Sequence, residues 1–140
     1  MMRGLRPHVE FDKPKLNELF KRLRKAGFVA KQNYLCCSSC AGYDLAIKYG
    51  KACDEGKGDK IQGYVFYHKQ DTEGLNETGD VFLAYGQISY WDNEKNVEKY
   101  TGPLTTVQVG NKIKELCEEL GIRYKWDGSE RTRFHLGLGK

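Results

Sequence analysis

Apolar residues recur at helical spacing in three segments of the chain. The first segment begins at Pro14, which suits an early helical position, and stops before Gly27. The second covers about residues 40–54, with Ser38 or Ser39 as its N-cap. The third begins at Thr105, which can form a capping box with Gln108. The spacing therefore predicts three amphipathic helices.

Between and after these helices the period changes to two, which predicts strands. Residues 64–69 and 80–86 alternate in this way and are expected to pair as an antiparallel hairpin, joined by a long loop at 70–79. The alternation predicts a last hairpin formed by residues 122–126 and 132–136. It also predicts a short strand at 28–30 and a candidate extension of the sheet at 88–91. Residues 92–103 are polar and are expected to form an exposed excursion.

This order predicts an α+β fold with two layers, in which about three helices pack on one face of a largely antiparallel sheet. We expect a single domain over residues 13–140, preceded by a flexible arm at residues 1–12. The charged fraction is 30% and the mean hydropathy is −0.68, and no apolar run reaches the roughly 20 residues of a membrane helix. These values exclude a membrane-spanning protein, and because the first ten residues resemble no secretory signal we expect a cytoplasmic one.

The chain contains five cysteines, and three of them lie close together in "YLCCSSCAGYD" at residues 34–44. Cys37 and Cys40 have the two-residue gap that lets two thiolates bind one zinc ion, but no second pair has this spacing. Further ligands would have to come from elsewhere in the fold. The candidates for them are Cys36, Cys53, His68, Asp71 and Cys117.

Two other interpretations of these cysteines stay open. Cys37 precedes a predicted helix start, where a thiolate is favoured, and it could act as a nucleophile with His68 and Asp71 if the strand end meets the helix start. Alternatively the thiols only pack as small apolar groups, which we expect for Cys53 and Cys117 on their helix stripes. A thioredoxin-type redox pair is disfavoured, because the cysteines lie between two predicted helices and not in an alternating strand-helix pattern, and no proline lies beside the relevant strand.

A second candidate feature lies in the last hairpin. If its alternate residues face the core, five basic or potentially basic side chains project from the opposite face: Arg123, Lys125, Arg131, Arg133 and His135. Like charges on neighbouring strands weaken a sheet, so this stripe calls for acidic neighbours or an acidic partner. Nucleic acid and an acidic protein surface are the candidate partners, and the net charge of +4 permits either.

Five motifs together resemble a family of uncharacterised bacterial domains of unknown function. They are "CCSSCAG", "GYVFYHKQDTE", "VFLAYG", the helix "VGNKIKELCEELGI" and the turn "WDGS". The resemblance covers about residues 15–136. The resemblance implies that ten residues of this chain belong to a motif of that family, and it implies no activity. The residues concerned are Cys36, Cys37, Cys40, His68, Gln70, Asp71, Thr72, Glu73, Tyr85 and Gly86.

From these observations we expect a small intracellular binding or regulatory module whose Cys/His region is structural or metal-binding, with zinc as the possible metal. In this interpretation the metal ligands are Cys36, Cys37, Cys40 and His68, and these cysteines approach the 68–71 segment in the fold. The first alternative is a thiol-dependent enzyme that uses Cys37 with His68 and Asp71. The second is a nucleic-acid or acidic-protein binder that uses Arg123, Lys125, Arg131 and Arg133.

Overall fold

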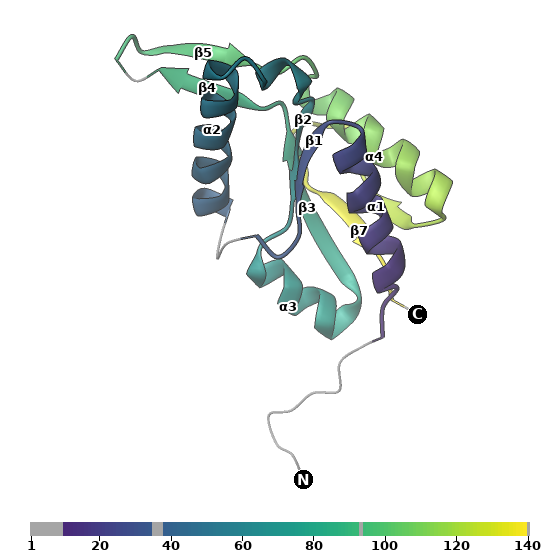
Figure 1. Cartoon of the computed structure of the whole chain (residues 1–140). Coiled ribbons are helices and arrows are strands. Elements are labelled where there is room, and N and C mark those ends of the chain that lie inside the picture. Colours follow the sequence, from purple (N-terminus) through teal and green to yellow (C-terminus); the bar gives the residue numbers. More distant parts are fainter. Residues whose placement is uncertain (1–9, 35–37, 93, 140) are drawn as a thin grey trace.

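The computed structural model describes residues 10–34, 38–92 and 94–139, and of residues 38–43 and 59 only the backbone. Among them it has four α-helices and seven strands (Figure 1). The helices are α1 (Lys13–Lys25), α2 (Ser38–Asp54), α3 (Lys69–Thr78) and α4 (Thr106–Leu120), with a short 3-10 helix η1 (Gly58–Lys60). The strands are β1 (Phe28–Lys31), β2 (Gly63–Phe66), β3 (Asp80–Gly86), β4 (Ser89–Asp92), β5 (Val97–Thr101), β6 (Arg123–Lys125) and β7 (Phe134–Gly137).

Five of the strands form one mixed sheet in the order β1-β2-β3-β7-β6. Only β1 and β2 run parallel, and the other three pairs are antiparallel. The predicted α+β class is therefore confirmed, as are the β2–β3 pair and the last hairpin, β6–β7.

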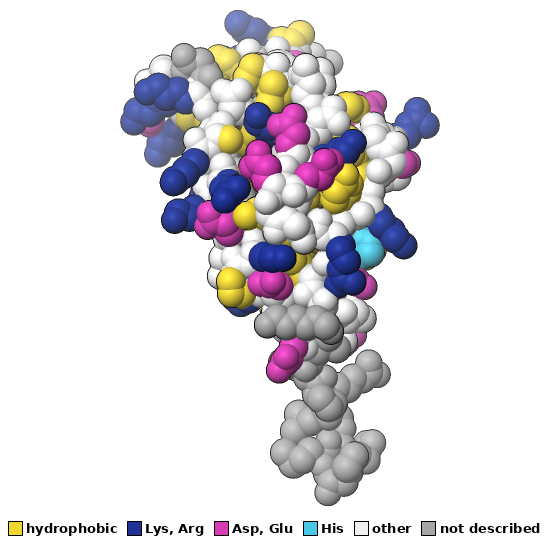
Figure 2. All heavy atoms as spheres, turned by 90° about the vertical axis from the view of Figure 1, so that its right-hand side faces the viewer, with side chains coloured by type: hydrophobic (Ala, Val, Ile, Leu, Met, Phe, Trp, Pro, Cys, Tyr) yellow, Lys and Arg dark blue, Asp and Glu magenta, His cyan; other side chains and the backbone are white. Residues whose placement is uncertain are grey.

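One face of this sheet carries the main core. Alternate residues of β3 point into it, so Val81 and Leu83 are fully enclosed together with Phe134 of β7. Helices α1 and α4 cover this face with the predicted stripes. On their outer surface, basic and acidic side chains are interspersed (Figure 2), and Arg22 of α1 pairs with Glu119 of α4. That surface is the solvated helix face expected for a soluble fold.

The opposite face is only half covered. Helix α2 lies on this face of the sheet (Figure 1). Its Leu45 packs against Phe66 of β2. The predicted packing of about three helices on one face is confirmed, because α3 joins α1 and α4 in the main core. The fourth helix, α2, packs on the other face, which the sequence did not indicate. The reason lies in β2, where Val65 faces α1 and α4 while Phe66 faces α2, so this strand is buried on both sides.

The predicted loop at 70–79 is also wrong, because residues 69–78 form the helix α3. His68 is its N-cap, and the His68 backbone N–H donates to Asp71 Oδ2 at 3.3 Å, the pattern of a capping box without its usual Ser or Thr. Gly79 ends the helix in the left-handed conformation, with φ at 79°. Leu75 anchors α3 in the core.

Residues 88–91 do not extend the main sheet, because β4 pairs with β5 in a separate two-stranded hairpin. The expected polar excursion at 92–103 therefore contains a strand, and the hairpin rests on α2, where the Tyr90 ring lies against Gly50. The expected arm at residues 1–12 lies mostly outside the described residues, although Phe11 bridges to Gly139. Within the described part of the chain, no helix is both long and apolar enough to span a membrane.

Candidate functional site

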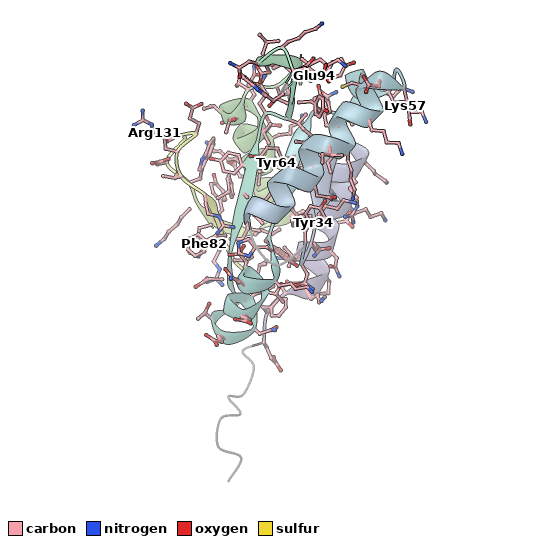
Figure 3. The ribbon with its side chains drawn as sticks, turned by 90° about the vertical axis from the view of Figure 1, so that its left-hand side faces the viewer. Tyr34, Lys57, Tyr64, Phe82, Glu94 and Arg131 are labelled. Atoms are coloured by element: carbon pink, nitrogen blue, oxygen red, sulfur yellow. The ribbon has the colours of Figure 1, made fainter. Side chains whose placement is uncertain are left out.

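The uncovered half of the second sheet face carries an exposed aromatic pair. Phe82 of β3 lies directly opposite His135 of β7, and their rings stack with centroids 4.7 Å apart and planes 16° apart. Phe82 is 46% exposed, although it lies in a strand near the middle of the sheet. Figure 3 shows it on the part of the sheet that α2 leaves open. An aromatic ring of this exposure on an internal strand is available for contact with a ligand.

Cationic side chains surround this pair, as the alternation in the last hairpin predicts. Phe134 and Leu136 are fully buried, so the residues between and beside them project from the open face. The exposed cations are Arg123 and Lys125 of β6, Arg131 before β7, and Arg133 beside its start. Together with Phe82 and His135 they form what we call the open sheet face. A hollow of about 310 Å³ lies on it beside β6.

Arg133 does not stand alone on this face, because it forms a bidentate pair with Asp71. Its Nη1 donates to Asp71 Oδ1 at 3.2 Å and its Nη2 to Oδ2 at 2.8 Å. Arg133 Nη2 also donates to the backbone carbonyl of Phe82 at 2.6 Å. The arginine is therefore fixed across β3, next to the stacked rings.

Asp71 also contacts His68, so it joins the two candidate features of the sequence. His68 Nε2 lies 3.3 Å from Asp71 Oδ2, and the two side chains are only 8% and 11% exposed. The other ring nitrogen of His68, Nδ1, is buried and has no hydrogen-bond partner among the described residues. The His68–Asp71 segment and the basic hairpin, which look independent in the sequence, thus form one connected group.

Thr72 connects this group to the chain that follows β1. The Thr72 Oγ1 donates to Asn33 Oδ1 at 2.8 Å. Tyr34, which follows Asn33 in the chain, donates its backbone N–H to the carbonyl of Tyr67 at 2.8 Å. Asp71 and Thr72 therefore have a structural role, which is to hold α3 against the ends of β1 and β2.

A hydrogen-bonded turn holds the loop that carries Arg131. Trp126 Nε1 donates to Tyr85 Oη at 2.6 Å, and this hydroxyl lies within 2.9 Å of the carbonyls of Ser129 and Thr132. Asp127 accepts from the Thr132 hydroxyl and from the Ser129 backbone N–H, which lowers the pKa of its exposed carboxyl. Burial raises the pKa of Tyr85, which keeps this hydroxyl protonated as a donor.

A cleft of about 330 Å³ separates α2 from the sheet. Leu45 and Ala46 line it from the helix, and Tyr64 and Ala84 line it from the sheet. Figure 3 shows Tyr64 between α2 and β3. Tyr64 and Ala84 also line a second hollow of about 250 Å³ that includes Arg131 and Arg133. The cleft therefore adjoins the open sheet face at Tyr64 and Ala84.

The cysteine predictions fall largely outside the described residues. This is the case for Cys36 and Cys37, while Cys40 lies in α2 with an undescribed side chain. Cys117 is fully buried, and burial raises the pKa of its thiol to about 12, so the packing role predicted for it is confirmed. Cys53 is half-buried. Among the described side chains, no three His, Cys, Asp or Glu groups lie close enough to hold a metal ion.

Sequence reasoning missed Phe82 and the cleft. The signal was present in "DVFLAYG", because two of its outward positions, Phe82 and Ala84, are apolar like its inward ones. An outward Phe beside the basic residues of the last hairpin would have marked the open sheet face, had the pairing of β3 with β7 been foreseen.

A family model described as "Domain of unknown function (DUF6891)" matches residues 8–138 of the chain. Comparison with curated proteins found no match, and comparison with solved structures found none either.

Proposed function

The chain belongs to this DUF6891 family, and we propose that it binds single-stranded nucleic acid on the open sheet face. The observation that carries the proposal is the exposed Phe82–His135 stack, which lies among cationic side chains on neighbouring strands. Proteins that bind single strands combine aromatic side chains, on which bases stack, with a basic surface that follows the phosphates. The open sheet face offers both.

The charges on this face support an anionic ligand. Asp71 pairs with Arg133, and Asp80 Oδ1 lies 3.3 Å from His135 Nε2. Glu130 is exposed and lines the hollow that contains Arg131 and Arg133, so it is the carboxylate nearest to the ligand path. Arg123, Lys125 and Arg131 form no ion pair within the described part of the chain, and all three are exposed. Three cations are therefore left for phosphate groups.

The exposed aromatic pair favours nucleic acid over an acidic peptide. Carboxylates of a peptide would use the three cations, but they would leave the face of Phe82 without a partner. Every nucleobase has a flat π surface that stacks on such a ring, and a single strand presents both bases and phosphates. The proposal therefore accounts for the cations and for the exposed Phe82 together.

We expect binding to a single-stranded oligonucleotide to weaken with salt. If Arg123, Lys125 and Arg131 each neutralise one phosphate, the slope of log affinity against log salt is about −2, because single strands release roughly 0.7 counterions per contact. Fluorescence anisotropy at several salt concentrations measures this slope for the wild type and for the Arg123→Ala, Lys125→Ala, Arg131→Ala triple variant.

The triple variant should bind with a slope near zero. A matched control replaces three cations of the α1 surface, Lys21, Arg24 and Lys25, which lie on the other side of the sheet. Equal loss in both variants would indicate attraction by net charge alone and would contradict the proposal. Binding of an acidic peptide in preference to oligonucleotides of the same charge would assign the face to a protein partner instead.

A second proposal, which the geometry of His68 favours, is a structural zinc site with Cys36, Cys37 and Cys40. His68 is only 6% exposed, and its Nε2 lies beside the carboxylate of Asp71. Its other ring nitrogen, Nδ1, has no hydrogen-bond partner among the described residues. A carboxylate on one ring nitrogen is the usual arrangement for a histidine that ligates metal through the other.

We expect purified protein to contain about one zinc per chain by mass spectrometry, and the Cys37→Ser, Cys40→Ser variant to contain none. A Cys53→Ser variant, which changes a cysteine outside the four ligands proposed here (Cys36, Cys37, Cys40 and His68), serves as the control. Protein without stoichiometric metal would contradict the zinc proposal. A thiol that titrates near neutral pH in that metal-free protein would instead support the thiol-dependent enzyme with Cys37, His68 and Asp71.

A further inference from the structure

We infer that the cleft between α2 and the sheet is a pocket for one unpaired nucleobase of the bound strand. This inference rests on the proposed function, since the base is delivered by the same strand that lies on the open sheet face. The cleft measures about 330 Å³, which is within the range of about 300–1,000 Å³ that small-ligand pockets have.

The position of the cleft favours a base from that strand. Tyr64 and Ala84 line both the cleft and the hollow that contains Arg131 and Arg133. A strand that stacks one base on Phe82 therefore meets the arginine hollow and then the mouth of the cleft, without leaving the sheet surface. Proximity to a cationic surface supplies a phosphate contact next to the pocket.

The lining of the cleft suits a flat, mostly apolar ring with polar edges. Leu45 and Ala46 cover it from α2, and Tyr64, which stacks on Phe66, forms part of the opposite wall. Aromatic and aliphatic walls of this kind hold bases by stacking and by van der Waals contact.

Two polar residues, Gln87 and Ser89, also line the cleft. The Gln87 amide nitrogen donates to the carbonyl of Gly102 at 2.8 Å, which fixes the side chain and leaves its Oε1 as an acceptor. The backbone N–H of Gln87 donates to the Thr106 hydroxyl at 3.1 Å, so this residue is held from both ends. A fixed amide oxygen is able to accept from an amino or ring N–H group on the edge of a base.

The test combines an abasic scan with a variant that fills the cleft. Eight-nucleotide single strands, each with one abasic position, are titrated against the wild type by fluorescence anisotropy. We expect two positions at which loss of the base lowers affinity about tenfold, the low end of the range for a stacked base. One position corresponds to stacking on Phe82 and the other to the cleft.

Ala84→Leu places a larger side chain in the cleft and should abolish the second sensitivity while the first is kept. Ala46→Leu fills the cleft from α2 and should give the same pattern, so the test does not depend on one variant folding. A Phe82→Ala variant should lose the first sensitivity and keep the second. Thermal unfolding of each variant confirms that it is folded before titration.

The outcomes separate this inference from the proposed function. The pocket would be overturned if the wild-type protein showed a single abasic-sensitive position and neither Ala84→Leu nor Ala46→Leu changed that sensitivity. The open sheet face would then remain as the binding surface. Wild-type protein that binds no single strand at all would overturn the proposed function itself.

Discussion

Replacement of Phe82 with alanine is expected to lower the affinity for a single-stranded oligonucleotide by about tenfold to a hundredfold. Alanine removes the exposed ring on which a base stacks, and one such contact contributes about 1–3 kcal/mol. Because Phe82 is 46% exposed and its partner His135 stays in place, the variant should remain folded. Isothermal titration calorimetry at fixed salt measures the loss.

The chain contains a matched control for this substitution. Trp91 of β4 is 50% exposed, so Trp91→Ala also removes a large exposed aromatic ring, but from the separate β4–β5 hairpin. We expect this variant to bind like the wild type. Phe82→Tyr should keep most of the affinity, because it preserves the ring. Equal losses for Phe82→Ala and Trp91→Ala would show that general hydrophobicity, and not the open sheet face, governs binding.

The parts of the fold that the sequence predicts well are those in which one local pattern decides the structure. Helix α4 is the clearest case, because Thr105 and Gln108 form the capping box and Gly121 ends the helix as expected. The strands of the last hairpin are similar, since buried Phe134 and Leu136 alternate with outward residues. In both elements the caps or the alternation agree with the tertiary contacts.

Helix α3 shows where local patterns fail. Its N-cap is His68, a residue type that seldom caps helices, and its sequence KQDTEGLNET contains Gly74 and a single buried apolar residue. What holds it is a set of contacts from distant segments: Arg133 binds Asp71 and Asn33 binds Thr72. No window of ten residues contains this information, so a loop was the natural prediction.

The candidate site also has a part that local sequence patterns predict and a part that depends on distant contacts. The outward projection of Arg123, Lys125 and Arg133 follows from period-two alternation and was predictable. Their surroundings depend on strand order, because only the pairing of β7 with β3 places His135 on Phe82 and leads Arg133 to Asp71. Strand order is a long-range property, and a single sequence specifies it through many weak contacts rather than through a motif.

Replacement of Asp71 with asparagine is expected to lower the free energy of unfolding by about 2–3 kcal/mol. Asp71 is 11% exposed and accepts two hydrogen bonds from the Arg133 guanidinium and one from the His68 backbone N–H. Asparagine keeps the shape but loses the charge, and its amide group places a donor where an acceptor is needed. Loss of one partner of a partly buried, hydrogen-bonded charge pair costs this much.

Urea unfolding followed by circular dichroism measures the change, with Glu73→Gln as the control. Glu73 lies two residues further along α3, is exposed, and undergoes the same loss of charge, so its substitution should change stability by less than about 0.5 kcal/mol. An unfolding midpoint for Asp71→Asn equal to that of Glu73→Gln would contradict the assigned role.

A double-mutant cycle with Arg133→Gln separates the two contributions of Asp71. If the bidentate pair dominates, the double variant is destabilised by much less than the sum of the single variants, with a coupling of about 1–2 kcal/mol. If the capping contact with His68 dominates, the two losses add, because Arg133 has no part in it. Strong coupling would mean that α3 and the open sheet face are stabilised as one unit, so that a change at His68 or Asp71 also moves the arginine that crosses β3 beside Phe82.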